Sequence, residues 1–201
     1  TFKSIGNLGF SGLTFSIAQI NHESVLETAI DGSIEVVLDE LIITGQDNSG
    51  IGAEHSITLG MCDGCSDGWK FGEDQDEYPD PPQIEYTNIH FYHPEWLGQE
   101  DENGNSCNQD EFASDFRSQH SFRELTSWGI KGSTGGSLSS DIDINLNWDS
   151  GKLISNSDNF KMFLYVGSED GIDMQEPNSI TISQSDLSLN GNGEPNIWVK
   201  M

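Results

Sequence analysis

The stretch DIDINLNW, residues 141–148, decides the fold class. Four apolar side chains alternate in it with four polar ones. The apolar set is Ile142, Ile144, Leu146 and Trp148, and the polar set is Asp141, Asp143, Asn145 and Asn147. Because successive side chains of a strand point to opposite faces, this period of two predicts a strand with one buried and one wet face.

Similar segments lie on both sides of this strand. They are LGFSGLTFSIAQI (8–20), SIEVVLDELIIT (33–44), IEYTNIHFY (84–92), FKMFLYVG (160–167), SITI (179–182) and NIWVK (196–200). Turns rich in Gly, Asn and Asp separate them. The pattern predicts an all-β fold, an antiparallel β-sandwich of jelly-roll type that forms one domain over residues 1–201. A short helical turn is expected only at residues 110–118.

The charge of the chain is extreme, with 34 acidic against 8 basic residues and a net charge of -26 among 201 residues. Such a field repels phosphates and anionic lipids, so nucleic acid and membrane surfaces are excluded as partners. No apolar run reaches the roughly 20 residues of a membrane span. Since the chain begins at Thr1 rather than at a methionine, we expect a processed piece of a larger protein.

Residues 61–119 differ from the rest of the chain and are interpreted as an acidic, aromatic, loop-rich insertion in the sandwich. Two long loops are expected in it, at residues 63–83 and 97–111. Loops of this length in a compact domain are usually functional or held by a disulfide or a metal ion. The insertion is therefore the first place to look for a site.

Three cysteines, Cys62, Cys65 and Cys107, lie in this insertion. One C-x-x-C pair and a distant third cysteine indicate a zinc site only weakly, because a fourth ligand would have to come from elsewhere. An extracellular disulfide suits the acidic composition better. We expect Cys65 to pair with Cys107, since a bridge within C-x-x-C closes only a small loop, and this leaves Cys62 without a role.

Calcium is the metal that the insertion favours, because calcium takes six to eight oxygen ligands from carboxylates, amides and carbonyls. The alternative is a solvated acidic loop. The side chains that offer such oxygens are Asp63, Asp67, Glu73, Asp74, Asp76, Glu77, Asp101, Asn103 and Asp110.

Four aromatic residues in or beside the insertion point to carbohydrate, namely Trp69, Tyr78, Tyr92 and Trp96. Sugar rings stack on exposed Trp and Tyr. The competing interpretation is that Trp69 and Trp96 fill the core beneath the loops, since large aromatic side chains are mostly buried. Trp128, Trp148 and Trp198 lie in strand patterns and are expected in the core.

Catalytic patterns are weak in this chain. His90 and His93 are three residues apart in a strand pattern, which places them on opposite faces and argues against a shared metal ion. The many carboxylates single out no acid–nucleophile pair of the kind that glycosidases use. The sequence contains no P-loop. We therefore expect a protein that is not an enzyme.

A series of motifs over roughly residues 55–150 resembles a β-rich module of large secreted bacterial surface proteins, many of them type IX secretion cargo. The elements that carry the resemblance are Leu59-Gly60, Asp67-Gly68-Trp69, residues 73–77 and 79–82, Asp115-Phe116-Arg117, Trp128 and residues 146–148. The cysteines depart from that pattern, as does a Leu-Gly where the module has Phe-Gly. The resemblance implies an extracellular module beside other modules and no catalytic residues.

Arg117 is one of few basic residues, so we expect it to form a buried or half-buried ion pair with a carboxylate and to pin the insertion to the sandwich. The Asp115–Arg117 pair is the candidate; an exposed arginine is the alternative.

Taken together, these observations predict a secreted, non-enzymatic surface module for adhesion or for an appendage. Its expected partners are copies of itself or neighbouring modules, which pair with its terminal strands TFKSIGNLGF and NIWVKM. A carbohydrate-binding module of a secreted polysaccharide-processing protein is the alternative function.

Overall fold

The computed structural model describes residues 8–10, 13–16, 29–31, 38, 40–77, 79, 85–118, 125–136, 138, 142–154, 160–167 and 170–201. Where one domain was expected, the chain divides into two compact units, residues 1–35 and 36–201. The first unit holds a small antiparallel sheet in the order β1-β2-β3. Its strands are β1 (Leu8–Phe10), β2 (Leu13–Ser16) and β3 (Ala29–Asp31).

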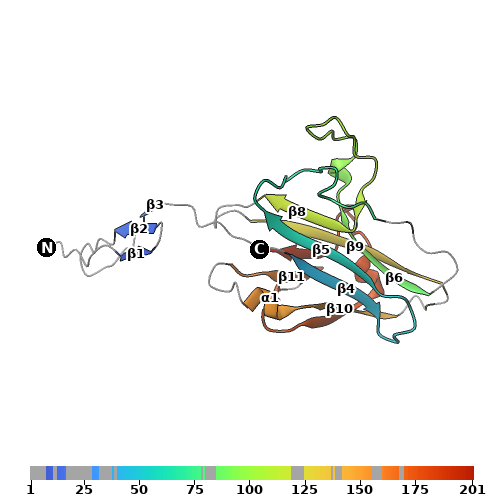
Figure 1. The fold of residues 1–201 in the computed structure, drawn as a ribbon. Helices are drawn as coiled ribbons and strands as arrows, with labels where there is room; N and C mark the ends of the chain where they lie inside the picture. Colours follow the sequence, from blue (N-terminus) through green and yellow to red (C-terminus); the bar gives the residue numbers. More distant parts are fainter. Residues whose placement is uncertain are drawn as a thin grey trace. The chain divides into compact units, whose positions relative to one another are not determined.

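The second unit contains two sheets that pack together, and the first of them has five strands in the order β13-β10-β4-β5-β8 (Figure 1). Its strands are β13 (Ser179–Ser183), β10 (Asp143–Trp148), β4 (Leu41–Asp47), β5 (His55–Cys62) and β8 (Ser114–Ser118). Neighbours are antiparallel except β5 and β8, which run parallel with Leu59 opposite Asp115.

The second sheet has six strands, all antiparallel to their neighbours, in the order β12-β11-β14-β9-β6-β7. Its strands are β12 (Ile172–Asp173), β11 (Phe163–Val166), β14 (Ile197–Lys200), β9 (Ser127–Gly135), β6 (Tyr86–Tyr92) and β7 (Glu111–Phe112). Among the described residues, the helical elements are one α-helical turn and two 3-10 turns. They are η1 (Pro94–Trp96), α1 (Ser150–Ile154) and η2 (Gln184–Leu187).

The core lies between these two sheets and confirms the all-β sandwich. In β10, Ile144 and Leu146 are fully buried, as the alternation of residues 141–148 predicts. A Cβ atom placed on Gly45 of β4 would lie 3.0 Å from Ile89 Cγ2 of β6, so the two sheets approach closely there. Leu59 and Trp128 are also fully buried in this core.

Two local expectations are wrong. Residues 110–118 form β7 and β8 rather than a helical turn, because Phe112 and Asp115 are drawn fully into the interior. The short helix α1 was not predicted. Asp149 starts it, since its Oδ1 accepts a hydrogen bond of 2.9 Å from the amide of Gly151.

Residues 61–119 are not a simple insertion. They include β8, which belongs to the five-stranded sheet, and β6 and β7, which belong to the six-stranded sheet. The loop-rich parts are residues 63–77 and 93–110, and the first sheet's edge strand β8 lies beside the former. This arrangement brings the polar side chains of both loops to one place.

Candidate functional site

The centre of the site is a buried ion pair on the edge strand β8, between Asp115 and Arg117. The two residues are two positions apart, so their side chains leave the same face of the strand. Arg117 Nε lies 2.6 Å from Asp115 Oδ1, and Arg117 Nη2 donates to Asp115 Oδ2 at 2.9 Å. The Asp115 side chain is fully buried and that of Arg117 is 12% exposed. The expected pair is therefore present, with one hydrogen bond and one further close ionic contact.

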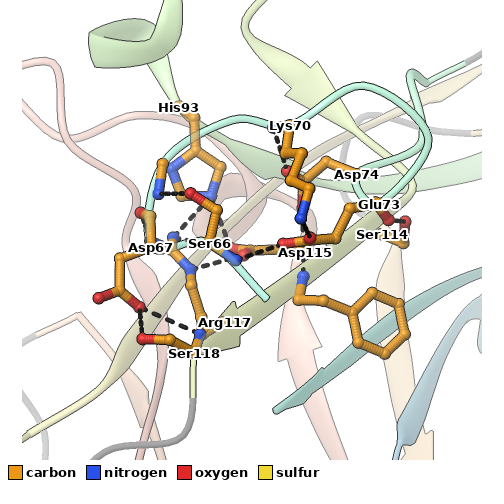
Figure 2. Close-up of polar contacts among 12 residues, drawn as sticks. Ser66, Asp67, Lys70, Glu73, Asp74, His93, Ser114, Asp115, Arg117 and Ser118 are labelled. Carbon is orange, nitrogen blue, oxygen red and sulfur yellow. Dashed lines mark hydrogen bonds and ion pairs between the residues drawn. The ribbon is translucent and has the colours of Figure 1, made fainter. Parts of the chain in front are cut away.

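His93 lies between the end of β6 in the second sheet and the start of η1, and its side chain contacts this ion pair. Its Nε2 lies 2.7 Å from Asp115 Oδ2, and its Nδ1 lies 2.7 Å from Glu95 Oε1. The ring stacks on Trp96 with 3.8 Å between centroids and an interplanar angle of 14°. Both ring nitrogens are thus engaged by carboxylates, and Figure 2 shows His93 beside Asp115 and Arg117.

The same cluster ties the loop of residues 63–77 to β8. Arg117 Nη1 donates to the carbonyl oxygen of Asp67 at 2.6 Å, and Asp67 Oδ1 accepts from Ser118 Oγ at 2.7 Å. Asp74 is buried, and its two carboxylate oxygens accept from the amides of Lys70 at 2.9 Å and Phe116 at 3.2 Å. Figure 2 shows these residues converging on the strand.

The other proposed calcium ligands are spread over the loops. Glu73 accepts from the Ser66 amide at 2.7 Å, and Glu77 lies 3.4 Å from His55 Nε2. Asp101 Oδ1 accepts from the amides of Asn103 and Asn105.

Three further proposed ligands, Asp63, Asp76 and Asp110, complete the calcium set. Asp63 and Asp76 are exposed, and the carbonyl of Asp110 accepts from the His93 amide at 2.8 Å. Within the described parts of the chain, no three His, Cys, Asp or Glu side chains form a group that could hold a metal ion. Several of these carboxylates instead act as acceptors for loop backbone.

The cysteine pairing differs from the expected one. The disulfide joins Cys62 and Cys65, whose Cα atoms are 5.3 Å apart, and Cys107 is a buried free thiol. The Cys107 Sγ donates to the carbonyl oxygen of Gln109 within its own loop at 3.2 Å. Burial raises the pKa of the Cys107 thiol, so this thiol is held in its neutral form.

Two of the four proposed sugar-binding aromatic residues are part of the core. Trp96 is 2% exposed and Trp69 is 7% exposed, so neither offers a flat ring to solvent. Trp96 is enclosed by His93 and by Phe112, whose ring centroid is 5.0 Å away. Tyr92 is half-buried, and Tyr78 lies outside the described residues.

A cavity of about 400 Å³ opens beside His93 and Arg117. Its other lining residues are Tyr92, Pro94, Glu95, Ser127, Gly193, Glu194, Pro195 and Trp198. Trp198, expected in the core, is half-buried here. The alternation in NIWVK indicates this outward position. Ile197 and Val199 point into the core, so Trp198 between them points outward.

Two buried groups of the cluster, His93 and Asp74, have raised pKa values. We therefore expect the free energy of unfolding to fall as pH rises. Burial works against protonation of His93, but its hydrogen bonds to Asp115 and Glu95 outweigh burial and raise its pKa. Burial raises the pKa of Asp74 to about 7, and the charge of Asp115 adds to this shift. Both groups bind a proton more tightly in the folded state than in the unfolded state, where their pKa values are about 6.5 and 3.9.

Stability is therefore lost through the titration of Asp74 between about pH 4 and 7, and through that of His93 as pH rises above about 6.5. We expect urea denaturation between about pH 5 and 8 to show a decline of a few kcal/mol. The pKa of Glu111 is lowered to about 2, mainly by its hydrogen bond with His90. Glu111 therefore stays ionised over this pH range and does not change the pH dependence of the free energy of unfolding. Asp74→Asn should flatten the decline below pH 7; an unchanged slope would contradict the role of Asp74.

Comparisons of the chain with protein-family models, with curated proteins and with solved structures found no match.

Proposed function

We propose that this chain is a non-enzymatic module of an extracellular or cell-surface protein and that it serves adhesion. The observation that supports this most is that the charged groups around the cavity are already paired with other protein groups. His93 is held by Asp115 and Glu95, and Arg117 is held by Asp115 and the backbone of Asp67. A histidine with both nitrogens engaged is a poor general base, whereas pinned loops around a cavity form a rigid binding face.

Three further observations support the extracellular location. The Cys62–Cys65 disulfide suits an oxidising compartment. The net charge of -26 keeps a displayed module soluble. The motif series over roughly residues 55–150 resembles surface modules of type IX secretion cargo. Among the described residues, no helix is long and apolar enough to cross a membrane.

Adhesion is favoured over assembly into an appendage through the C-terminal strand. That strand, β14, is hydrogen-bonded on one side to β11 and on the other to β9, so it has no free edge for a second copy. At the other end of the chain, β1 is an edge strand of its small sheet. We propose that any pairing with a neighbouring module uses β1.

Sedimentation velocity of the native chain, in calcium and then in chelator, tests this proposal. We expect a monomer in both conditions, and large assemblies would favour the appendage instead. Calcium remains a prediction from the acidic loops, and the same samples test it. Calcium should raise the midpoint of thermal unfolding more than sodium chloride of equal ionic strength does. Equal shifts would mean that cations only screen the net charge of -26.

A further inference from the structure

We propose that the cavity beside η1 binds a ring of a neutral sugar, with Trp198 as its stacking surface. This inference rests on the proposed function and names the ligand class of the same site. The cavity of about 400 Å³ falls within the roughly 300–1,000 Å³ that is usual for small-molecule sites. It combines aromatic side chains with a few polar ones, which is the composition that fixes and orients a small ligand.

Trp198 is presented on the outer face of the six-stranded sheet. In the register of the sheet it lies opposite Gly129 of β9. Its ring atoms Cη2 and Cζ3 lie 3.2 Å from the position that a Cβ atom of Gly129 would occupy, so the indole lies over the bare backbone of that glycine. Its Nε1 donates to the carbonyl oxygen of Pro195 at 2.8 Å. The ring is therefore fixed before a ligand arrives, which lowers the entropic cost of binding.

The remaining lining residues complement a pyranose, which has an apolar face of C–H groups and a rim of hydroxyls. Tyr92 adds a second aromatic side chain, itself held by Lys131 Nζ at 4.9 Å from its ring centroid. Glu95 and Glu194 supply carboxylate acceptors, and Ser127 supplies a hydroxyl. Hydroxyl donors of a sugar pair well with such carboxylates, because charge-assisted hydrogen bonds are the stronger ones.

Charge selects neutral sugars over acidic ones. The positive groups at the cavity, Arg117 and His93, are already paired with Asp115 and Glu95. Glu194 has an amide partner, Asn190 Nδ2 at 3.3 Å, and no cationic partner among the described residues. With a net charge of -26 on the whole chain, a uronate or sulfated sugar would be repelled.

A second outward-facing aromatic side chain lies next to Trp198, outside the cavity. Tyr165 of β11 is the register neighbour of Trp198, and it points outward because Leu164 before it is buried. Lys200 Nζ lies 4.8 Å from the Tyr165 ring centroid.

The test uses the full chain on an array of neutral oligosaccharides, among them glucans, mannans, xylans and chitin fragments, beside acidic ones such as pectins. The best ligand is then titrated against variants by calorimetry. We expect a neutral oligosaccharide to bind and Trp198→Ala to weaken the binding about tenfold or more. Glu194→Gln, an exposed change, should weaken it several-fold. Phe71→Ala, an exposed aromatic that does not line the cavity, is the matched control and should leave affinity unchanged.

Binding of acidic glycans alone, or an unchanged affinity in both Trp198→Ala and Glu194→Gln, would overturn the inference. If Trp198→Ala does not fold, Glu194→Gln decides the matter. Failure of the inference is separable from failure of the proposed function. If the chain is a monomer and binds no glycan, the sugar site is overturned but the adhesion proposal still stands. An oligosaccharide that is shortened on incubation with the chain would confirm sugar binding and overturn the non-enzymatic proposal.

Discussion

Arg117→Ala is expected to lower the free energy of unfolding by about 3–5 kcal/mol, measured by urea denaturation at neutral pH. The substitution leaves the Asp115 carboxylate, which is fully buried, without the guanidinium that lies 2.6 Å away. It also removes the hydrogen bond of 2.6 Å to the Asp67 carbonyl that ties the acidic loop to β8. The Asp115 carboxylate then keeps only the His93 ring, at 2.7 Å, and removal of one member of a buried ion pair is among the most destabilising changes in a folded protein.

The matched control is Lys161→Ala. Lys161 Nζ pairs with Asp173 at a similar distance of 2.7 Å, but its side chain is 59% exposed. Exposed pairs contribute only about 0–1 kcal/mol, so this variant should stay close to the native chain. Equal losses in the two variants would show that burial does not set the strength of the Arg117 pair. The double variant Asp115→Ala/Arg117→Ala should lose less than the sum of the two single changes, because it removes the unpaired charge as well.

Trp96→Ala is expected to cost about 3–5 kcal/mol of unfolding free energy, read from the same denaturation curves. Trp96 is 2% exposed and is enclosed by the His93 and Phe112 rings, with Arg117 Cζ 5.0 Å from its centroid. Removing the indole leaves a cavity under the loops and exposes the His93 ring. A loss of this size would show that Trp96 is a core residue rather than a surface on which a sugar ring stacks.

Phe71→Ala is the control for Trp96→Ala, since Phe71 is 69% exposed and its loss should change stability by no more than about 0.5 kcal/mol. A further check is the coupling of Trp96→Ala with Arg117→Ala. Residues in contact typically couple by about 0.5–3 kcal/mol, so the two losses should not add. A Trp96→Ala variant as stable as the Phe71→Ala variant would contradict the buried position.

The strands of this fold could be predicted because their signal is local. Residues 143–148 and 197–200 alternate in the sequence and form β10 and β14 in the structure. The ion pair could be predicted as well, since Asp115 and Arg117 are two residues apart and Arg117 is a rare cation in an acidic chain.

The contacts that complete the site could not be predicted, because they join distant parts of the chain. Asp67 and Arg117 are 50 residues apart, and His93 reaches Asp115 across 22 residues. Their meeting depends on the parallel pairing of β5 with β8, which no periodicity indicates. The disulfide prediction failed for a related reason. A bridge that closes a longer loop stabilises a fold more in theory, but the Cys107 thiol hydrogen-bonds the carbonyl oxygen of Gln109 and Cys65 is bonded to Cys62.

The central position of β14 also bears on how the polypeptide folds during synthesis. Residues 197–200 fill the space between β9 and β11, so this inner strand is synthesised after both of the strands that flank it. Until then, both neighbouring strands expose unpaired edges, which are prone to association with other nascent chains. Because β14 pairs with strands that are distant in the sequence, we expect this sheet to fold slowly compared with domains built from local hairpins.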